Sequence, residues 1–145
     1  KKQVAASGQI AAFGQHSGVA VTGSDAFFLP RFSINEKYGG IDRFRLTINA
    51  LPIPVTDVVP ADPKLTINPP AYGFTVKKII ADIGRLNCFA SHLPTAVNIE
   101  RLGRQRFEVR FEKPFPPGRG RINCTMRSES GRWRWLGHQF VAPNS

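Results

Sequence analysis

Two tryptophans and two arginines alternate near the end of the chain, at Arg132, Trp133, Arg134 and Trp135. In an extended strand the side chains alternate between faces, so the tryptophans share one face and the arginines the other. Tryptophan rings can stack on sugar rings or bases, and guanidinium groups can pair with carboxylates or phosphates. These four residues are therefore candidate glycan-binding residues. The alternative, which we expect, is that both rings seal a β-core.

The two cysteines, Cys88 and Cys124, each lie in a segment that reads as extended. A side-chain period of two puts each of them on an apolar face of its segment. A disulfide between them would close a loop of about 35 residues and would stabilise the fold by about 3–4 kcal/mol. The alternative is that both are small buried hydrophobic residues. We favour the disulfide, provided that the protein is exported.

The three histidines, His16, His92 and His138, are far apart in the sequence. None is spaced with another ligand as a metal-binding pair, and the motifs HExxH, CxxC and G-x-S-x-G do not occur. The sequence also contains no glycine-rich motif of a phosphate-binding loop. The sequence therefore predicts no metal site and no complete catalytic set within this chain.

The elements that must position these residues are strands from residue 71 onward. Short apolar segments recur there with turn residues between them, which is typical of a small antiparallel sandwich, and we expect an immunoglobulin-like one. In 105–111 the alternation is clearest, with Phe107 and Val109 inward and charged residues outward. The expected strands are 72–76, 86–91, 97–102, 105–111, 121–127 and 132–141. Residues 79–83 are ambiguous between a short helix and a strand.

The first part of the chain reads as an αβ unit. Residues 1–7 resemble the end of a helix that stops at Gly8. Residues 9–13 read as a short buried strand, and residues 27–32, which contain a proline, as an edge strand or the end of a strand. Apolar residues at helical spacing predict a helix over 41–51, which ends before Pro52. A proline-rich crossing follows, with one strand at 55–59. A lone strand at 9–13 lacks a partner, so we expect the chain to be a fragment or to be completed by a companion chain.

The chain of 145 residues is basic, with 20 Lys and Arg against 10 Asp and Glu and a net charge of +10. Such a charge suits nucleic acid, an anionic membrane surface or an acidic polysaccharide, or serves solubility alone. No apolar run approaches the ~18 residues of a membrane span. The first residues do not form a signal peptide, so an export signal, if there is one, would lie upstream.

Seven stretches together resemble one family. They are AFGQHSG at 12–18, LPRF at 29–32, NEKYG at 35–39, LPIPV at 51–55, LNCFAS at 86–91, RINCT at 121–125 and RWRW at 132–135. The first four resemble the distal part of bacterial polysaccharide deacetylases of the NodB-homology type. The last three resemble the β-rich extension that follows this domain in a subset of them. The resemblance covers nearly the whole chain.

This resemblance implies a distorted (β/α) barrel that removes acetyl groups from N-acetylated sugars. The family holds a divalent metal, commonly zinc, with an Asp and two His, and uses a second Asp as general base. Those motifs are not in this chain, so the resemblance implies the C-terminal portion of the enzyme, inactive alone, with the N-terminal portion missing or separate. We expect residues 1–59 to be distal barrel elements and residues 60–145 an accessory β-sandwich.

The resemblance also implies a mixed fold, an N-acetylated polysaccharide as substrate, and no cofactor within this chain. Arg31 is the one candidate catalytic residue, because it could support a carboxylate of the missing portion; the alternative is an arginine that ties strand to helix. Export to the cell envelope, the periplasm or the medium is expected if the disulfide forms, and a cytoplasmic location otherwise.

Two other functions stay open. The first is an independent carbohydrate-binding or protein-interaction β-module that uses Trp133 and Trp135. The second is a basic nucleic-acid binder, which we expect less because no binding motif occurs and aromatic interleaving is confined to one strand.

Overall fold

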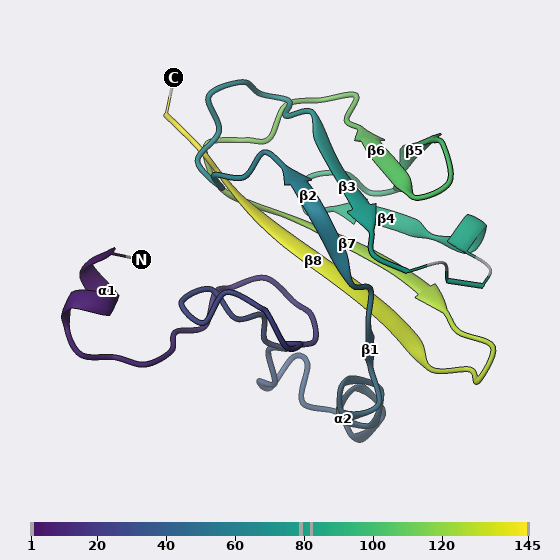
Figure 1. Ribbon diagram of the computed structural model, residues 1–145, viewed down its shortest axis with the longest axis horizontal. Helices are drawn as coiled ribbons and strands as arrows, with labels where there is room; N and C mark the ends of the chain where they lie inside the picture. The colour runs from purple at the N-terminus through teal and green to yellow at the C-terminus, as the bar shows by residue number, and fades with distance from the viewer. Residues whose placement is uncertain (1, 79, 82, 145) are drawn as a thin grey trace.

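The computed structural model describes residues 2–78, 80–81 and 83–144. The architecture is mixed and β-rich, with two short α-helices and eight strands in one curled sheet of order β1-β8-β7-β4-β5-β6-β3-β2 (Figure 1). The strands are β1 Leu51–Pro52, β2 Val55–Val59, β3 Tyr72–Val76, β4 Asn87–Ala90, β5 Ala96–Leu102, β6 Arg106–Arg110, β7 Gly118–Arg127 and β8 Trp133–Ala142. The expected strands from residue 55 onward are confirmed to within a few residues at their ends.

The sheet curls at β5, because the two halves of this strand have different partners. Its first residues pair with β4, and residues 98–102 pair with β6. All pairings between these eight strands are antiparallel except that of β1 with β8. The core is therefore enclosed by one continuous curled sheet.

Hydrophobic alternation explains why these segments are strands. In β6, Phe107 and Val109 are 3% and 1% exposed, while Arg110 is exposed and pairs with Glu100 on β5. The β5–β6 turn contains Gly103 at φ 87°, a left-handed conformation that costs glycine little. The predicted inward face of this segment is confirmed.

The longest hairpin joins β7 and β8 in ten consecutive residue pairs, from Gly118–Ala142 to Arg127–Trp133. Its loop contains Gly131 at φ 76°. The inward side chains of β7 are fully buried and include Ile122, Cys124 and Met126. In the sheet, this hairpin lies between β1 on one side and β4 on the other.

Aromatic rings fill the core beneath the hairpin. The Phe140 ring lies 5.6 Å from Tyr72 and 5.1 Å from Phe115, measured between ring centroids. Asn68 holds Phe115 in place, because its Nδ2 donates to the Phe115 carbonyl at 2.7 Å and its Oδ1 accepts from the Phe115 N–H at 2.8 Å. The proline-rich segment before β3 is thus fixed to the core.

The first fifty residues contain less regular structure than expected. Helix α1 spans Lys2–Ala6, and Gly8 follows it at φ 79°, as predicted for a helix stop. The strands expected at 9–13 and 27–32 are wrong, because these segments form only an isolated parallel bridge between Phe13 and Leu29. Among the described residues, neither segment takes part in a ladder of the sheet.

Helix α2 spans Ile41–Ile48, so the expected helix is confirmed but ends three residues early. Asn49 caps it, and β1 begins at Leu51. Within the expected 79–83 segment, the described residues include the start of a 3-10 turn, Ile83–Arg85; residues 79 and 82 lie outside the described residues. No α-helix among the described residues is long and apolar enough to cross a membrane.

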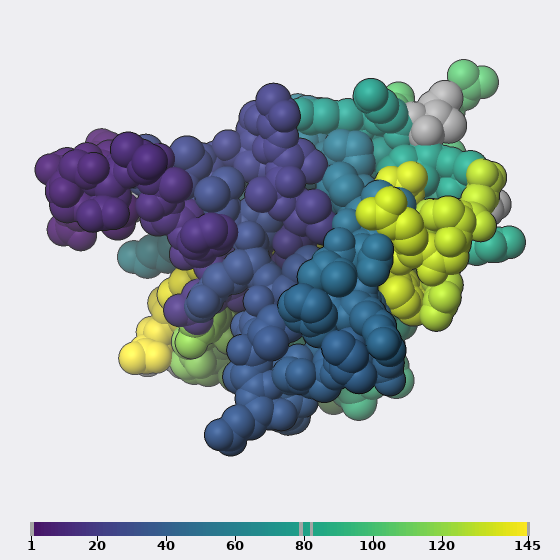
Figure 2. Space-filling model, turned by 90° about the horizontal axis from the view of Figure 1, so that it is seen from below, coloured from purple at the N-terminus to yellow at the C-terminus, as the bar shows by residue number. Residues whose placement is uncertain are grey.

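The N-terminal segment projects from one side of the molecule (Figure 2). Among the described residues, neither α-helix buries a side chain. Ile10 is 91% exposed and Phe13 65% exposed. Strands β1 and β2 lie in the same sheet as the later strands, and the proposed division after residue 59 stays a prediction.

Candidate functional site

The tryptophans lie on the outer face of the β7–β8 hairpin, not against the core. Trp135 pairs with Thr125, whereas Leu136 pairs with the buried Cys124. Directly paired residues share a face of the sheet, so Trp133 and Trp135 point away from the face that carries Cys124. The expectation that both rings seal the β-core is wrong. The two rings share a face, as predicted, but this is the outer face of the sheet and not the face that covers the core.

Residues of the first fifty cover this outer face in part. The Trp135 Nε1 donates to Asn123 Oδ1 at 3.0 Å, and the Phe32 ring meets Trp135 edge-on at 5.2 Å between centroids. The Arg43 guanidinium lies 5.2 Å from the centre of the Trp135 ring, and that of Arg127 lies 4.8 Å from the centre of Trp133. Cation–π contacts therefore hold both rings.

The two arginines that alternate with the tryptophans each donate a hydrogen bond to a backbone carbonyl. Arg132 Nε donates to the Asn49 carbonyl at 2.7 Å, and Arg134 Nη1 donates to the Pro52 carbonyl at 3.2 Å. These bonds tie the hairpin to the end of α2 and to β1. Arg132 and Arg134 consequently act in the structure as ties between segments, and sequence spacing alone could not reveal these carbonyl partners.

A groove runs along the outer face beside Trp135. It consists of two adjoining cavities of about 360 and 390 Å³, and both include Arg43, Phe89, Asn123 and Trp135. We call it the outer-face groove. Its further lining residues are Ser17, Ser33, Tyr38, Leu46, Ala90, Ser91, Arg121, Thr125 and Trp133. It combines aromatic rings, cations and hydroxyl groups, which is the composition of a polar-ligand site.

Most of the groove does not follow from the sequence-based predictions. They place Phe89 in a strand without marking its ring as a surface group, yet it is 46% exposed. The strand period is the signal that could have found it, because a residue next to the inward Cys88 points outward. Arg43 and Tyr38 are brought to the groove by the packing of the N-terminal segment, for which the sequence holds no local signal.

Arg31 lies in the N-terminal segment, directly before Phe32, whose ring contacts Trp135. Its Nε donates to the Gly14 carbonyl at 3.2 Å, and its backbone N–H donates to the His16 carbonyl at 3.0 Å. Arg31 is exposed, and the structure shows no hydrogen bond from its two terminal nitrogens to the described residues. The side chain thus fixes the loop at 14–16 and keeps part of its guanidinium on the surface.

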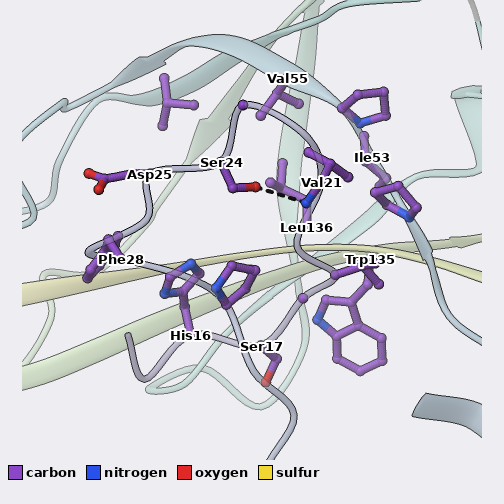
Figure 3. A pocket seen from close by; sticks show the side chains of 18 of the residues that line it. His16, Ser17, Val21, Ser24, Asp25, Phe28, Ile53, Val55, Trp135 and Leu136 are labelled. Carbon is purple, nitrogen blue, oxygen red and sulfur yellow. Dashed lines mark hydrogen bonds between the residues drawn. The ribbon is translucent and has the colours of Figure 1, made fainter. Parts of the chain in front are cut away.

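Another cavity, of about 270 Å³, separates the loop at 16–30 from β1, β2 and β8 (Figure 3). His16 and Phe28 stack on one side of it, with ring centroids 4.6 Å apart, and Ile53, Val55 and Leu136 line the other (Figure 3). Ser24 Oγ accepts a hydrogen bond from the Val21 N–H at 2.9 Å, which closes a turn at the rim. Beside these apolar side chains, its lining includes the polar side chains of His16, Ser17, Ser24, Asp25 and Lys77.

His138 lies on the inner face of β8, next to Tyr72. Their rings are 5.3 Å apart between centroids, and both His138 Nε2 and the Tyr72 hydroxyl are buried without a hydrogen-bond partner in the described part of the chain. Burial, followed by the positive charge that His16 can carry, lowers the pKa of His138 to about 4. Burial raises the pKa of Tyr72. Both groups are therefore neutral at pH 7 and belong to the core.

Cys88 and Cys124 face each other directly across β4 and β7 and form a disulfide, with their Cα atoms 3.9 Å apart. Both are fully buried. The pairing favoured from the sequence agrees with this geometry. The bond joins two central strands of the curled sheet.

Within the described part of the chain, no cluster of His, Cys, Asp and Glu side chains could hold a metal ion. Searches of protein-family models, curated proteins and solved structures found no match to this chain.

Proposed function

We propose that this chain is the C-terminal portion of a metal-dependent polysaccharide N-deacetylase, whose metal and base residues lie in a portion outside the chain. In this proposal residues 1–59 are the distal elements of a (β/α) barrel, and residues 60–145 are an immunoglobulin-like accessory domain. The divalent metal, commonly zinc in this family, would be bound by the other portion. The proposal starts from the seven stretches that resemble the family.

The observation that carries the proposal is the exposed apolar surface of the N-terminal segment. Ile10, Phe13, Ile41 and Ile48 are 91%, 65%, 59% and 62% exposed. Large apolar side chains left exposed along one segment of the chain support a contact with another structure. A barrel that uses residues 9–48 as its last elements would cover them.

Arg31 has a specific role in this proposal. Its Nε bond to the Gly14 carbonyl holds the guanidinium at the surface of the same segment. From there its terminal nitrogens can donate to a carboxylate of the catalytic portion. Arg31 would then be a positioning residue that acts through that carboxylate.

The test uses the natural polypeptide that contains this chain and its preceding residues. We expect it to release acetate from N-acetylglucosamine oligomers, and the double variant Ile10→Asp and Phe13→Asp to lose most of this activity. The matched control is Leu102→Asp on β5, a residue that is 49% exposed and far from the segment in sequence. Equal activity of the double variant and the control would contradict the proposal.

A second candidate function is glycan binding by this chain itself, as an independent module. The outer-face groove favours it, because exposed aromatic rings and polar side chains line one depression. The same alternative includes an independent module that binds another protein and not a glycan.

A further inference from the structure

We propose that the outer-face groove binds an oligosaccharide whose pyranose rings carry carboxylate groups. The inference rests on the proposed function only for the expectation that the ligand is a glycan. Arg132 and Arg134, which the sequence suggested, each donate to a backbone carbonyl, of Asn49 and Pro52, and neither lines the groove. The arginines that line it are Arg43 and Arg121.

The charge of the groove selects an anionic ligand. Arg43 lines both cavities and Arg121 lines one of them, while no Asp or Glu is among the described lining residues. The Arg43 guanidinium lies 5.2 Å from the centre of the Trp135 ring and 5.7 Å from that of Phe32, which holds this cation at the groove wall. A carboxylate matches the planar guanidinium group.

The aromatic rings of the groove select a ring-shaped ligand. Phe89 is directly paired with Asn123, on the outer face of the central strands, and it is 46% exposed there. Trp135 stands beside it and is held by Asn123 and Phe32. The apolar faces of pyranose rings can pack on such side chains, as on the aromatic rings of other ligand sites.

The remaining polar groups suit sugar hydroxyls better than a phosphate backbone. Ser33, Tyr38, Ser91 and Asn123 contribute hydroxyl and amide groups to the same cavity as Arg121. Proteins that bind single-stranded nucleic acid have cations along a groove that tracks several nucleotides. Two arginines in a groove rich in hydroxyl groups favour the acidic glycan.

The test measures the affinity of the isolated chain for a galacturonic acid hexamer by isothermal titration calorimetry. We expect Arg43→Gln, Arg121→Gln and Phe89→Ala each to raise Kd by about tenfold, the usual size of a lost charge-assisted hydrogen bond or aromatic contact. The matched controls are Arg45→Gln on α2 and Arg119→Gln on β7, which lie outside the groove lining. They should change Kd by less than about twofold.

Comparator ligands decide the chemical class. A neutral N-acetylglucosamine hexamer should bind at least about tenfold more weakly than the acidic hexamer, because it lacks the carboxylates that pair with the arginines. Equal binding of the neutral hexamer, tighter binding of single-stranded DNA, equal effects of the groove and control variants, or no binding would each overturn the inference. Since the isolated chain is used, deacetylase activity of the longer polypeptide does not affect the result.

Discussion

The backbone of Ser17 crosses Gly137 so closely that a β-carbon on Gly137 would collide with the Ser17 carbonyl group. Gly137 lies within β8, and Ser17 lies in the N-terminal segment. The neighbouring bridge between Gly18 and Leu136, and the bond from the Gln15 N–H to Gln139 Oε1 at 2.9 Å, belong to the same contact. Because glycine has no side chain, Gly137 of β8 lets the N-terminal segment pack closely on the β-sheet.

Gly137→Ala should displace the N-terminal segment and lower the free energy of unfolding by about 1–3 kcal/mol, because the new methyl group meets backbone that cannot rotate away. Gly84→Ala is the control, since a β-carbon there meets nothing within 4 Å. Urea denaturation compares the two variants. Equal stabilities would show that the crossing at Ser17 is looser than described.

Replacing both Cys88 and Cys124 by Ala should lower the free energy of unfolding by about 3–4 kcal/mol, because the bond closes a loop with a sequence separation of 36 residues. Urea denaturation of the oxidised protein and of the double variant measures this difference. Thiol titration of the unfolded, unreduced protein should find no free cysteine. Two free thiols would contradict the pairing.

The stability of the protein should fall as the pH drops from 7 to 5, in part because of His138. Its folded pKa of about 4 lies below the ordinary value of about 6.5, so the unfolded chain takes up the proton first. The stabilising contribution is complete above about pH 6.5 and is lost towards pH 4, with a loss of about 2 kcal/mol by pH 5. Urea denaturation at the two pH values measures it.

The variant His138→Gln isolates this contribution, because it removes the titrating ring. The pH dependence of unfolding should flatten in His138→Gln and persist in the control His92→Gln, whose ring bonds to the Lys113 carbonyl away from β8. A slope that is unchanged in His138→Gln would show that other groups cause the acid destabilisation.

Arg31→Gln in the longer polypeptide should lower kcat by about tenfold with little change in KM, because a positioned guanidinium–carboxylate pair is lost. Arg31→Lys should recover part of the activity and shift the acid limb of the pH–rate profile. The melting temperature of the isolated chain serves as the control measurement. A loss of stability without any change in kcat would assign Arg31 to a purely structural role.

The strands after residue 70 could be predicted because each carries its own alternation, as Phe107 and Val109 do in β6. The segment before residue 50 could not, because its strands would need partners that the described chain does not supply. Phe13 and Leu29 form one bridge where ladders were expected. Local pattern predicts which residues are apolar, but only long-range pairing decides whether a strand forms.

The candidate site was predicted in part for the same reason. The shared face of Trp133 and Trp135 follows from the strand period, yet which face is inward depends on the register with β7. The structure shows that register through the pairing of Cys124 with Leu136, which places Leu136 on the inner face and the tryptophans on the outer one. The carbonyl partners of Arg132 and Arg134 come from residues 49–52, more than eighty positions away. Such contacts leave no trace in the local sequence.

The most direct measurement of the central claim is acetate release from N-acetylated glycans by the natural polypeptide that contains this chain. The account predicts release that stops with a metal chelator and returns when zinc is added, and no release by residues 1–145 alone. Acetate release by residues 1–145 alone, or a longer polypeptide that is inactive with zinc on every N-acetylated glycan, would contradict it.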